Sequence, residues 1–161
     1  MNYKLLALGG DGIGPEVLES GLSILEAISE KNNINFEISF DLIGGTCWDK
    51  YGTFCRNSTI EKAIESDAIL VGAVGGPKWD AMKIKGDPEE QDGLMCLRKK
   101  LGAFFGIRPA KNYKSLQNII PFNKECVQNS EIIILREMCG GVMFSKPRGL
   151  KFQENDKRYG F

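Results

Sequence analysis

The chain has 161 residues, of which 42% are apolar and 26% charged, as is typical of a soluble globular domain or part of a larger protein. Its formal net charge is zero, which excludes a strong overall attraction to nucleic acid or to a membrane surface. It contains no histidine, so the commonest general base and metal ligand is missing.

The cysteines and the amino terminus predict a reduced, cytoplasmic protein. No two cysteines form a CxxC pair and their spacings are wide, so we expect reduced thiols rather than a disulfide framework or a zinc site. The apolar runs are too short to cross a bilayer, and MNYKLLALGG lacks the features of a signal peptide. We therefore expect no membrane partner. The cysteines are Cys47, Cys55, Cys96, Cys126 and Cys139.

The first half of the chain predicts strands that alternate with helices. An apolar run at residues 3–8 leads into the turn GGDGIG, and a helix follows with Pro15 in its first turn. Residues 35–43 alternate like a strand, and residues 59–65 form a short amphipathic helix. The continuous apolar run at residues 68–74 is typical of a buried parallel strand. This order predicts an α/β fold with a parallel sheet.

The second half begins with a long polar loop. GGPKWDAMKIKGDPEEQDG is rich in turn residues, and loops at the carboxyl end of a parallel strand often bind a ligand. GLMCLRKKLGAFF predicts a helix, and EIIILR predicts another apolar strand. A basic stretch covers residues 93–124, but its adjacent Phe104 and Phe105 suggest core side chains, so we expect no nucleic-acid partner.

Two glycine-rich motifs each have two interpretations. GDGIGPEV, residues 10–17, is a strand-to-helix turn that suits a ligand at a helix amino terminus, or simply a tight turn. VGGPKWD, residues 74–80, is a flexible ligand-binding loop, or a loop that its tryptophan anchors. The residues alone do not decide between these interpretations.

Three arginines point to an anionic ligand. Arg98 falls near the end of the predicted helix, Arg108 follows an expected turn at Gly106, and Arg136 ends a strand. Arginine binds carboxylates with two parallel hydrogen bonds, which lysine cannot match. If the three converge near the carboxyl edge of the sheet, they would suit a substrate with two carboxylates. The alternative is exposed surface charge, which is usual for any single arginine.

Taken in order, five stretches resemble the amino-terminal half of the 3-isopropylmalate dehydrogenase family. They are GDGIGPEV, GAVGGPKWD, LRKKLGAFFGIRPAK, LREMCGG and KPRG. These enzymes are β-hydroxyacid oxidative decarboxylases, as is isocitrate dehydrogenase. The resemblance implies an isopropylmalate dehydrogenase-like α/β fold, with a parallel or mixed sheet and flanking helices, that is incomplete here. Residues 1–103 would begin the domain on the NAD-binding side. Residues 104–161 would begin the second, dimer-forming domain and its arm.

The resemblance also implies substrate-binding residues. Arg98, Arg108 and Arg136 fall at the positions that hold the malate carboxylates. Leu94 and Met95, four and three residues before Arg98, fall where the isopropyl group is bound. The isocitrate branch would show a serine and asparagine pattern there, which GLMCLR lacks.

The cofactors implied by the resemblance are NAD and Mg²⁺ or Mn²⁺. The chemistry is hydride transfer from C2 of the substrate to NAD, followed by loss of the β-carboxylate, in a homodimer. The family's metal-binding aspartates and catalytic lysine would lie beyond Phe161, so no metal ligand is expected in this chain. The implied NAD-binding residues are Ile13, Gly76, Pro77, Lys78, Trp79, Asp80, Glu90 and Gln91.

One residue departs from the family pattern. Met143 occupies the place of the family's catalytic tyrosine, and a thioether cannot donate a proton. We therefore expect a full-length enzyme with Met143 to be severely slowed at the protonation step. We expect the isolated chain to be inactive, because the family's catalytic lysine and metal ligands lie beyond Phe161. One alternative is a non-catalytic remnant that binds dicarboxylates, in which Met143 reflects the loss of catalytic activity. Another is a sister decarboxylase acting on tartrate, malate or homoisocitrate, against which Leu94 and Met95 argue mildly.

Overall fold

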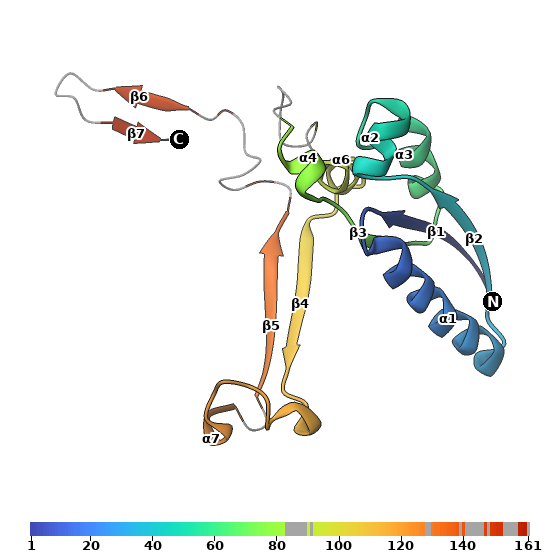
Figure 1. The fold of residues 1–161 in the computed structure, drawn as a ribbon, viewed down its shortest axis with the longest axis vertical. Coiled ribbons are helices and arrows are strands. Elements are labelled where there is room, and N and C mark those ends of the chain that lie inside the picture. The colour runs from blue at the N-terminus through green and yellow to red at the C-terminus, as the bar shows by residue number, and fades with distance from the viewer. Residues whose placement is uncertain are drawn as a thin grey trace. The chain divides into compact units, whose positions relative to one another are not determined.

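The protein consists of two compact units, Met1–Gly102 and Ala103–Phe161, each with its own secondary structure. Figure 1 shows the computed structural model. It describes residues 1–82, 90, 92–127, 130–138, 140, 147, 149–152 and 158–160. In this part of the chain, no helix is long and apolar enough to cross a membrane.

The first unit is built on a three-stranded parallel sheet with the strand order β2-β1-β3 (Figure 1). The alternation of strands and helices that the sequence predicts is confirmed. The elements are β1 (Asn2–Gly10), α1 (Gly14–Asn32), β2 (Asn35–Asp41), α2 (Gly45–Tyr51), α3 (Asn57–Ile64), β3 (Ala68–Ala73), α4 (Pro77–Asp80) and α6 (Gly93–Lys100).

The core lies on both faces of the central strand β1. Leu6 and Leu8 are fully buried and pack in one cluster with Ile60 of α3 and Leu97 of α6. The alternate side chains of β1 face the other way, where α1 packs on β1 and β3. Each fully buried leucine contributes about 1.5–3 kcal/mol relative to an exposed one. The central strand is therefore the best-anchored element of this unit.

The strand β3 is less buried than its apolar sequence predicts. Ala68 is exposed and the remaining residues of β3 are half-buried, so the prediction of a buried strand is wrong. Among the described residues, β3 pairs only with β1 and therefore forms one edge of the sheet. The strand β3 has the apolar composition of an interior strand, but in the described part of the chain a neighbouring strand pairs with it on one side only.

The helix α6 ends earlier than predicted. Asp92 caps its amino terminus, since the carboxylate accepts hydrogen bonds from the backbone N–H groups of Leu94 and Met95 at 2.8 and 3.1 Å. The helix stops at Lys100, and Gly102 follows with a φ of 61°, a conformation that glycine adopts without strain. The prediction that the helix continues through Phe105 is therefore wrong.

The second unit contains two antiparallel strand pairs. The larger pair, which we call the ribbon, joins β4 (Phe105–Lys111) to β5 (Glu131–Glu137). The strand at EIIILR is confirmed, whereas β4 was not predicted and Gly106 lies inside it rather than at a turn. Phe104 and Phe105 are more than half exposed, which corrects their assignment to a core. The other elements are η1 (Lys114–Leu116), α7 (Lys124–Val127), β6 (Leu150–Phe152) and β7 (Arg158–Gly160).

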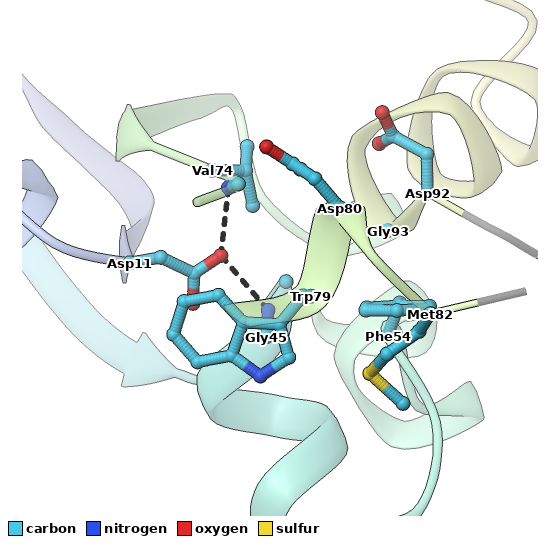
Figure 2. A pocket seen from close by; sticks show the side chains of 11 residues that line it. Asp11, Gly45, Phe54, Val74, Trp79, Asp80, Met82, Asp92 and Gly93 are labelled. Atoms are coloured by element: carbon cyan, nitrogen blue, oxygen red, sulfur yellow. Dashed lines mark hydrogen bonds between the residues drawn. The ribbon is translucent and has the colours of Figure 1, made fainter. Parts of the chain in front are cut away.

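A buried carboxylate joins the loops at the carboxyl edge of the parallel sheet. Asp11 directly follows β1 and is 2% exposed. Its Oδ2 accepts hydrogen bonds from the backbone N–H groups of Gly45 and Gly75, both at 2.8 Å, and its Oδ1 accepts one from Thr46 at 2.7 Å. Figure 2 shows this carboxylate between the two loops. One side chain thus ties the start of α2 to the segments that follow β1 and β3.

The glycines before α2 make room for this arrangement. A Cβ on Gly44 would collide with the Asp11 carboxylate and with Val74, and its φ of 80° favours glycine independently. A glycine at position 44 is therefore a steric requirement of the Asp11 hydrogen bonds, whereas the space at Gly45 is taken by the indole ring of Trp79.

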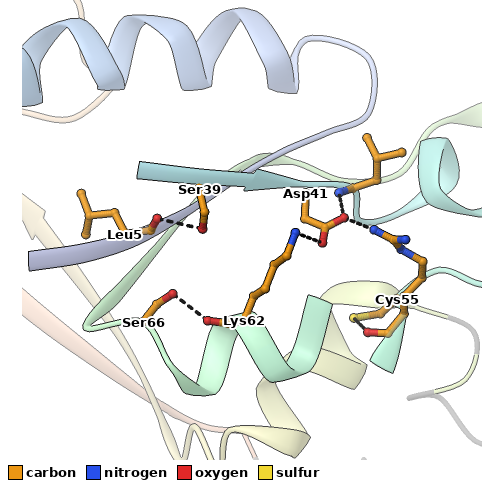
Figure 3. Close-up of polar contacts among 8 residues, drawn as sticks. Leu5, Ser39, Asp41, Cys55, Lys62 and Ser66 are labelled. Carbon is orange, nitrogen blue, oxygen red and sulfur yellow. Dashed lines mark hydrogen bonds and ion pairs between the residues drawn. The ribbon is translucent and has the colours of Figure 1, made fainter. Parts of the chain in front are cut away.

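A second carboxylate organises the end of β2. The Asp41 side chain is 3% exposed and pairs with Arg56 and with Lys62, whose Nζ lies 3.0 Å from Oδ2 (Figure 3). It also accepts the backbone N–H of Leu42 at 2.8 Å. Burial alone would raise the pKa of Asp41, but the hydrogen bonds from Lys62, Leu42 and Arg56 outweigh it, so the pKa lies below its usual value.

We expect Asp11→Asn to destabilise the first unit by about 1–3 kcal/mol, because the amide nitrogen would face backbone N–H donors and leave them unpaired. Urea unfolding followed by circular dichroism measures the loss. Asp80→Asn is the matched control: Asp80 is exposed, so this change should stay within about 0.5 kcal/mol. Equal stabilities of the two variants would contradict the role of Asp11.

We expect Asp41→Asn to cost about 1–3 kcal/mol at neutral pH. The folded pKa is lowered, so the contribution of this carboxylate is present above its unfolded pKa of about 3.9 and is lost as the pH falls through the folded value. The stability difference between wild type and variant should therefore shrink below about pH 4. Glu37→Gln, on the exposed side of β2, is the control. A difference that stays constant in urea unfolding from pH 7 to pH 3 would contradict this prediction.

Candidate functional site

A pocket of about 260 Å³ lies at the carboxyl edge of the parallel sheet (Figure 2). Its walls come from the segments after β1 and β3 and from the starts of α2 and α6. This is the position at which parallel α/β sheets commonly bind ligands. Residues that line it include Asp11, Gly45, Gly75, Trp79, Asp80 and Gly93.

The loop after β3 is fixed to α2 by the side chain of Trp79. A Cβ on Gly45 would overlap the indole ring, so the ring lies directly against the backbone of α2. The indole Nε1 donates a hydrogen bond to Asp49 Oδ1 at 3.2 Å, and Lys78 Nζ lies 2.6 Å from Asp49 Oδ2. The interpretation of VGGPKWD as a loop anchored by its tryptophan is confirmed, and the loop also lines the pocket.

The charge of Asp49 suits this anchoring role. Hydrogen bonds from Lys78 and then from Trp79 lower the pKa of Asp49 below its usual value, so the carboxylate is ionised at neutral pH. The pair is exposed to solvent, where such ion pairs contribute little stability. Its role is therefore to orient α4 rather than to stabilise the unit.

The residues suggested for NAD binding are spread over this edge. Trp79 and Asp80 line the pocket, whereas Lys78 is directed to Asp49. Gly76 and Pro77 begin α4, with Gly76 as its amino-terminal cap. Ile13 lies in the turn before α1 and is 58% exposed, which is unusual for an isoleucine in a tight turn.

Glu90 lines a different pocket of the first unit, together with Cys55 and Cys96. Gln91 and Met143 lie outside the described residues, so the structure gives no account of them. In the described part of the chain, no group of three or more His, Cys, Asp or Glu side chains could hold a metal ion.

Three of the substrate residues suggested by the sequence are on one helix. Leu94, Met95 and Arg98 all lie on α6 and are half-buried. Arg98 follows the other two by four and three residues, which is the spacing of one helix face. The structure thus brings an apolar pair and a guanidinium together on α6.

Arg108 and Arg136 lie on the ribbon of the second unit. Among the described residues, β5 pairs with β4 and joins no strand of the parallel sheet. The register pairs Gly106 with Arg136 and Arg108 with Ile134. Both arginines therefore project from one face of the ribbon as diagonal neighbours, and both are exposed. We call these two residues the arginine pair.

Sequence analysis missed two residues that shape the pocket. Asp11 stands between glycines directly after an apolar strand, and a carboxylate in that place was a usable signal. Asp49 gave no such signal, because it lies in α2, a helix that was not predicted. Its partners Lys78 and Trp79 are about thirty residues away in the chain.

Comparisons with known proteins agree with this architecture. A family model described as isocitrate/isopropylmalate dehydrogenase matches residues 4–160. The 3-isopropylmalate dehydrogenase of Hydrogenovibrio crunogenus is 40% identical over all 161 residues, which cover 44% of that protein. The enzyme of the same name from Aquifex aeolicus is 43% identical over 157 residues, 98% of this chain and 42% of that protein. The chain thus spans less than half the length of these relatives.

Two solved structures share the fold. The isocitrate dehydrogenase of Methylococcus capsulatus superimposes with a TM-score of 0.70 at 17% identity, over 99% of this chain and 42% of that one. A β-decarboxylating dehydrogenase of Thermococcus kodakarensis gives 0.64 at 24% identity, over 99% and 40%. The chain belongs to the isocitrate/isopropylmalate dehydrogenase family.

Proposed function

We propose that this chain is the amino-terminal part of a 3-isopropylmalate dehydrogenase. The complete enzyme would convert 3-isopropylmalate to 2-oxoisocaproate by NAD-dependent oxidative decarboxylation, a step of leucine biosynthesis in the cytoplasm. Relatives of that name at about 40% identity support the proposal. The structural observation that carries it is the arginine pair on one exposed face of the ribbon.

The arginine pair suits a dicarboxylate. Diagonal neighbours on one face of an antiparallel pair have Cβ atoms about 7–8 Å apart, within reach of two long side chains. Each guanidinium can bind one carboxylate through two parallel hydrogen bonds. Arg98 on α6 would complete the set that the family resemblance implies. Leu94 and Met95 on the same helix would contact the isopropyl group, since both offer apolar, half-buried side chains.

The pocket of the first unit fits part of NAD. Asp80 offers an exposed carboxylate that can accept hydrogen bonds from ribose hydroxyls, and Gly75 and Gly76 let a ligand approach the backbone. Asp11 and Asp49 would hold this loop in place before the cofactor arrives. NAD, when bound, supplies the acceptor for the hydride that leaves C2 of the substrate.

The proposals of a divalent metal cofactor and of a homodimer rest on the resemblance to the family. A divalent metal would polarise the substrate oxygen, but the described residues offer no cluster to hold it, so we derive no step through a metal. A homodimer of the complete enzyme is supported by the apolar side chains that the ribbon exposes, such as Ile133 and Leu135.

We expect Arg108→Ala to weaken binding of 3-isopropylmalate to the chain about 10- to 100-fold, because a charge-assisted hydrogen bond contributes about 1.5–3 kcal/mol. Isothermal titration calorimetry measures the change. Lys111→Ala is the matched control: Lys111 lies on the same strand but projects from the opposite face of the ribbon. Equal losses in the two variants would mean that general positive charge, and not the arginine pair, binds the ligand.

We expect the purified 161-residue chain to form no NADH from 3-isopropylmalate and NAD, even with Mg²⁺ or Mn²⁺ present. Its described residues hold no metal-binding cluster, and Met143 cannot donate a proton. Absorbance of NADH measures the rate. In a full-length enzyme that carries this sequence, Met143→Tyr should raise kcat by about 10²–10⁴. Metal-dependent turnover by the isolated chain would refute this prediction.

A further inference from the structure

A second pocket of the first unit contains Glu90, which the family resemblance suggests for NAD binding, but its other lining residues have no part in the proposed function. Its volume is about 590 Å³, and its walls contain two cysteines and two lysines. They are Cys55, Cys96, Lys99 and Lys100. The two thiols share this pocket although they lie 41 residues apart in the chain.

The packing of α6 brings the two thiols together. Gly93, the first residue of α6, lies so close to the carbonyl of Phe54 that an added Cβ would overlap it. Cys96 lies one helical turn further on, and its neighbour Leu97 is 2% exposed in the core. The face of α6 that carries Cys96 is therefore pressed against the segment that contains Cys55.

The two thiols differ in exposure. Cys55 is 9% exposed and belongs to the core cluster, whereas Cys96 is half-buried at the edge of that cluster. Burial raises the pKa of Cys55 to about 12, and the Cys96 thiol adds to this through its charge and a hydrogen bond. Both thiols line one pocket, and Cys55 keeps its proton at neutral pH.

We propose that Cys55 and Cys96 form a reversible disulfide by exchange with a small anionic disulfide that enters this pocket. Lys99 and Lys100 outnumber Glu90 among the charged residues that line the pocket, so it attracts such an anion. The disulfide would join α6 covalently to the segment before α3. This inference goes beyond the proposed function and does not depend on it.

The exchange takes place in two balanced steps. The thiolate of Cys96, the more exposed sulfur, attacks one sulfur of the small disulfide, whose S–S bond breaks and releases one thiolate. Cys55 then loses its proton to solvent, and its sulfur attacks Cys96 and releases the second small thiol. Two protein thiols are oxidised and one small disulfide is reduced to two thiols. Because Cys55 holds its proton firmly, the second step is the slow one and becomes faster as the pH rises.

The test uses the 161-residue chain under native conditions with oxidised glutathione as the probe. Remaining thiols are alkylated, and the products are mapped by mass spectrometry without reductant. We expect a mixed disulfide at Cys96 first, then a Cys55–Cys96 cross-link that dithiothreitol reverses. In the Cys55→Ser variant, the reaction should stop once one glutathione is bound to Cys96 as a mixed disulfide. Cys126→Ser, at an exposed cysteine of the second unit, should cross-link like the wild type.

Three outcomes would overturn the proposal. The wild-type chain could show no Cys55–Cys96 cross-link, or it could cross-link mainly between other cysteines. The third outcome is that the native chain and the chain in urea give the same mixture of cross-links. The wild-type map alone decides between these outcomes, so the test does not depend on whether the serine variants fold. Arg108→Ala should cross-link normally, which separates this result from a failure of dicarboxylate binding.

Discussion

The carboxylate of Asp11 is the constraint on which the candidate site depends. It is almost fully buried and accepts three backbone hydrogen bonds from two loops that would otherwise have unpaired N–H groups. A buried, unpaired donor costs about 1–3 kcal/mol, so this single side chain decides whether the loop geometry is stable. Gly44 follows from the same constraint, because a Cβ there would collide with the carboxylate. Asp11 thus fixes the backbone of two segments that line the pocket.

The sequence predicted the fold where its signals are local. The turn GGDGIG with Pro15 after an apolar run identified the first strand and helix, because capping and periodicity act within a few residues. Prediction from the sequence failed where contacts between residues far apart in the chain determine the structure. FGIRPAK contains glycine and proline and does not look like a strand, yet it pairs with β5 along its whole length. The hydrogen-bond partners of Asp11 were equally hidden, since they lie 34, 35 and 64 residues away in the chain.

The pocket and the arginine pair, one in each unit, rest on scaffolds of different stability. The pocket of the first unit is formed by loops from a sheet whose central strand is buried on both faces. The arginine pair projects from a ribbon of two strands, and an isolated ribbon of this kind is marginally stable in water. Ile107 and Leu135 on one face and Ile134 on the other are all exposed. Covering these side chains would stabilise the ribbon by about 25 cal/mol for each Å² of apolar surface removed from water, and would fix the arginine pair in place.

The position of Trp79 gives the molecule an intrinsic optical reporter. Its indole ring lines the pocket, lies against Gly45 and donates a hydrogen bond to Asp49. The chain has one other tryptophan, Trp48, which is stacked on Phe54 with ring centroids 4.8 Å apart. A phenylalanine at position 48 would leave Trp79 as the sole indole emitter. Its fluorescence would then respond to a nucleotide that enters the pocket, without any added dye or label.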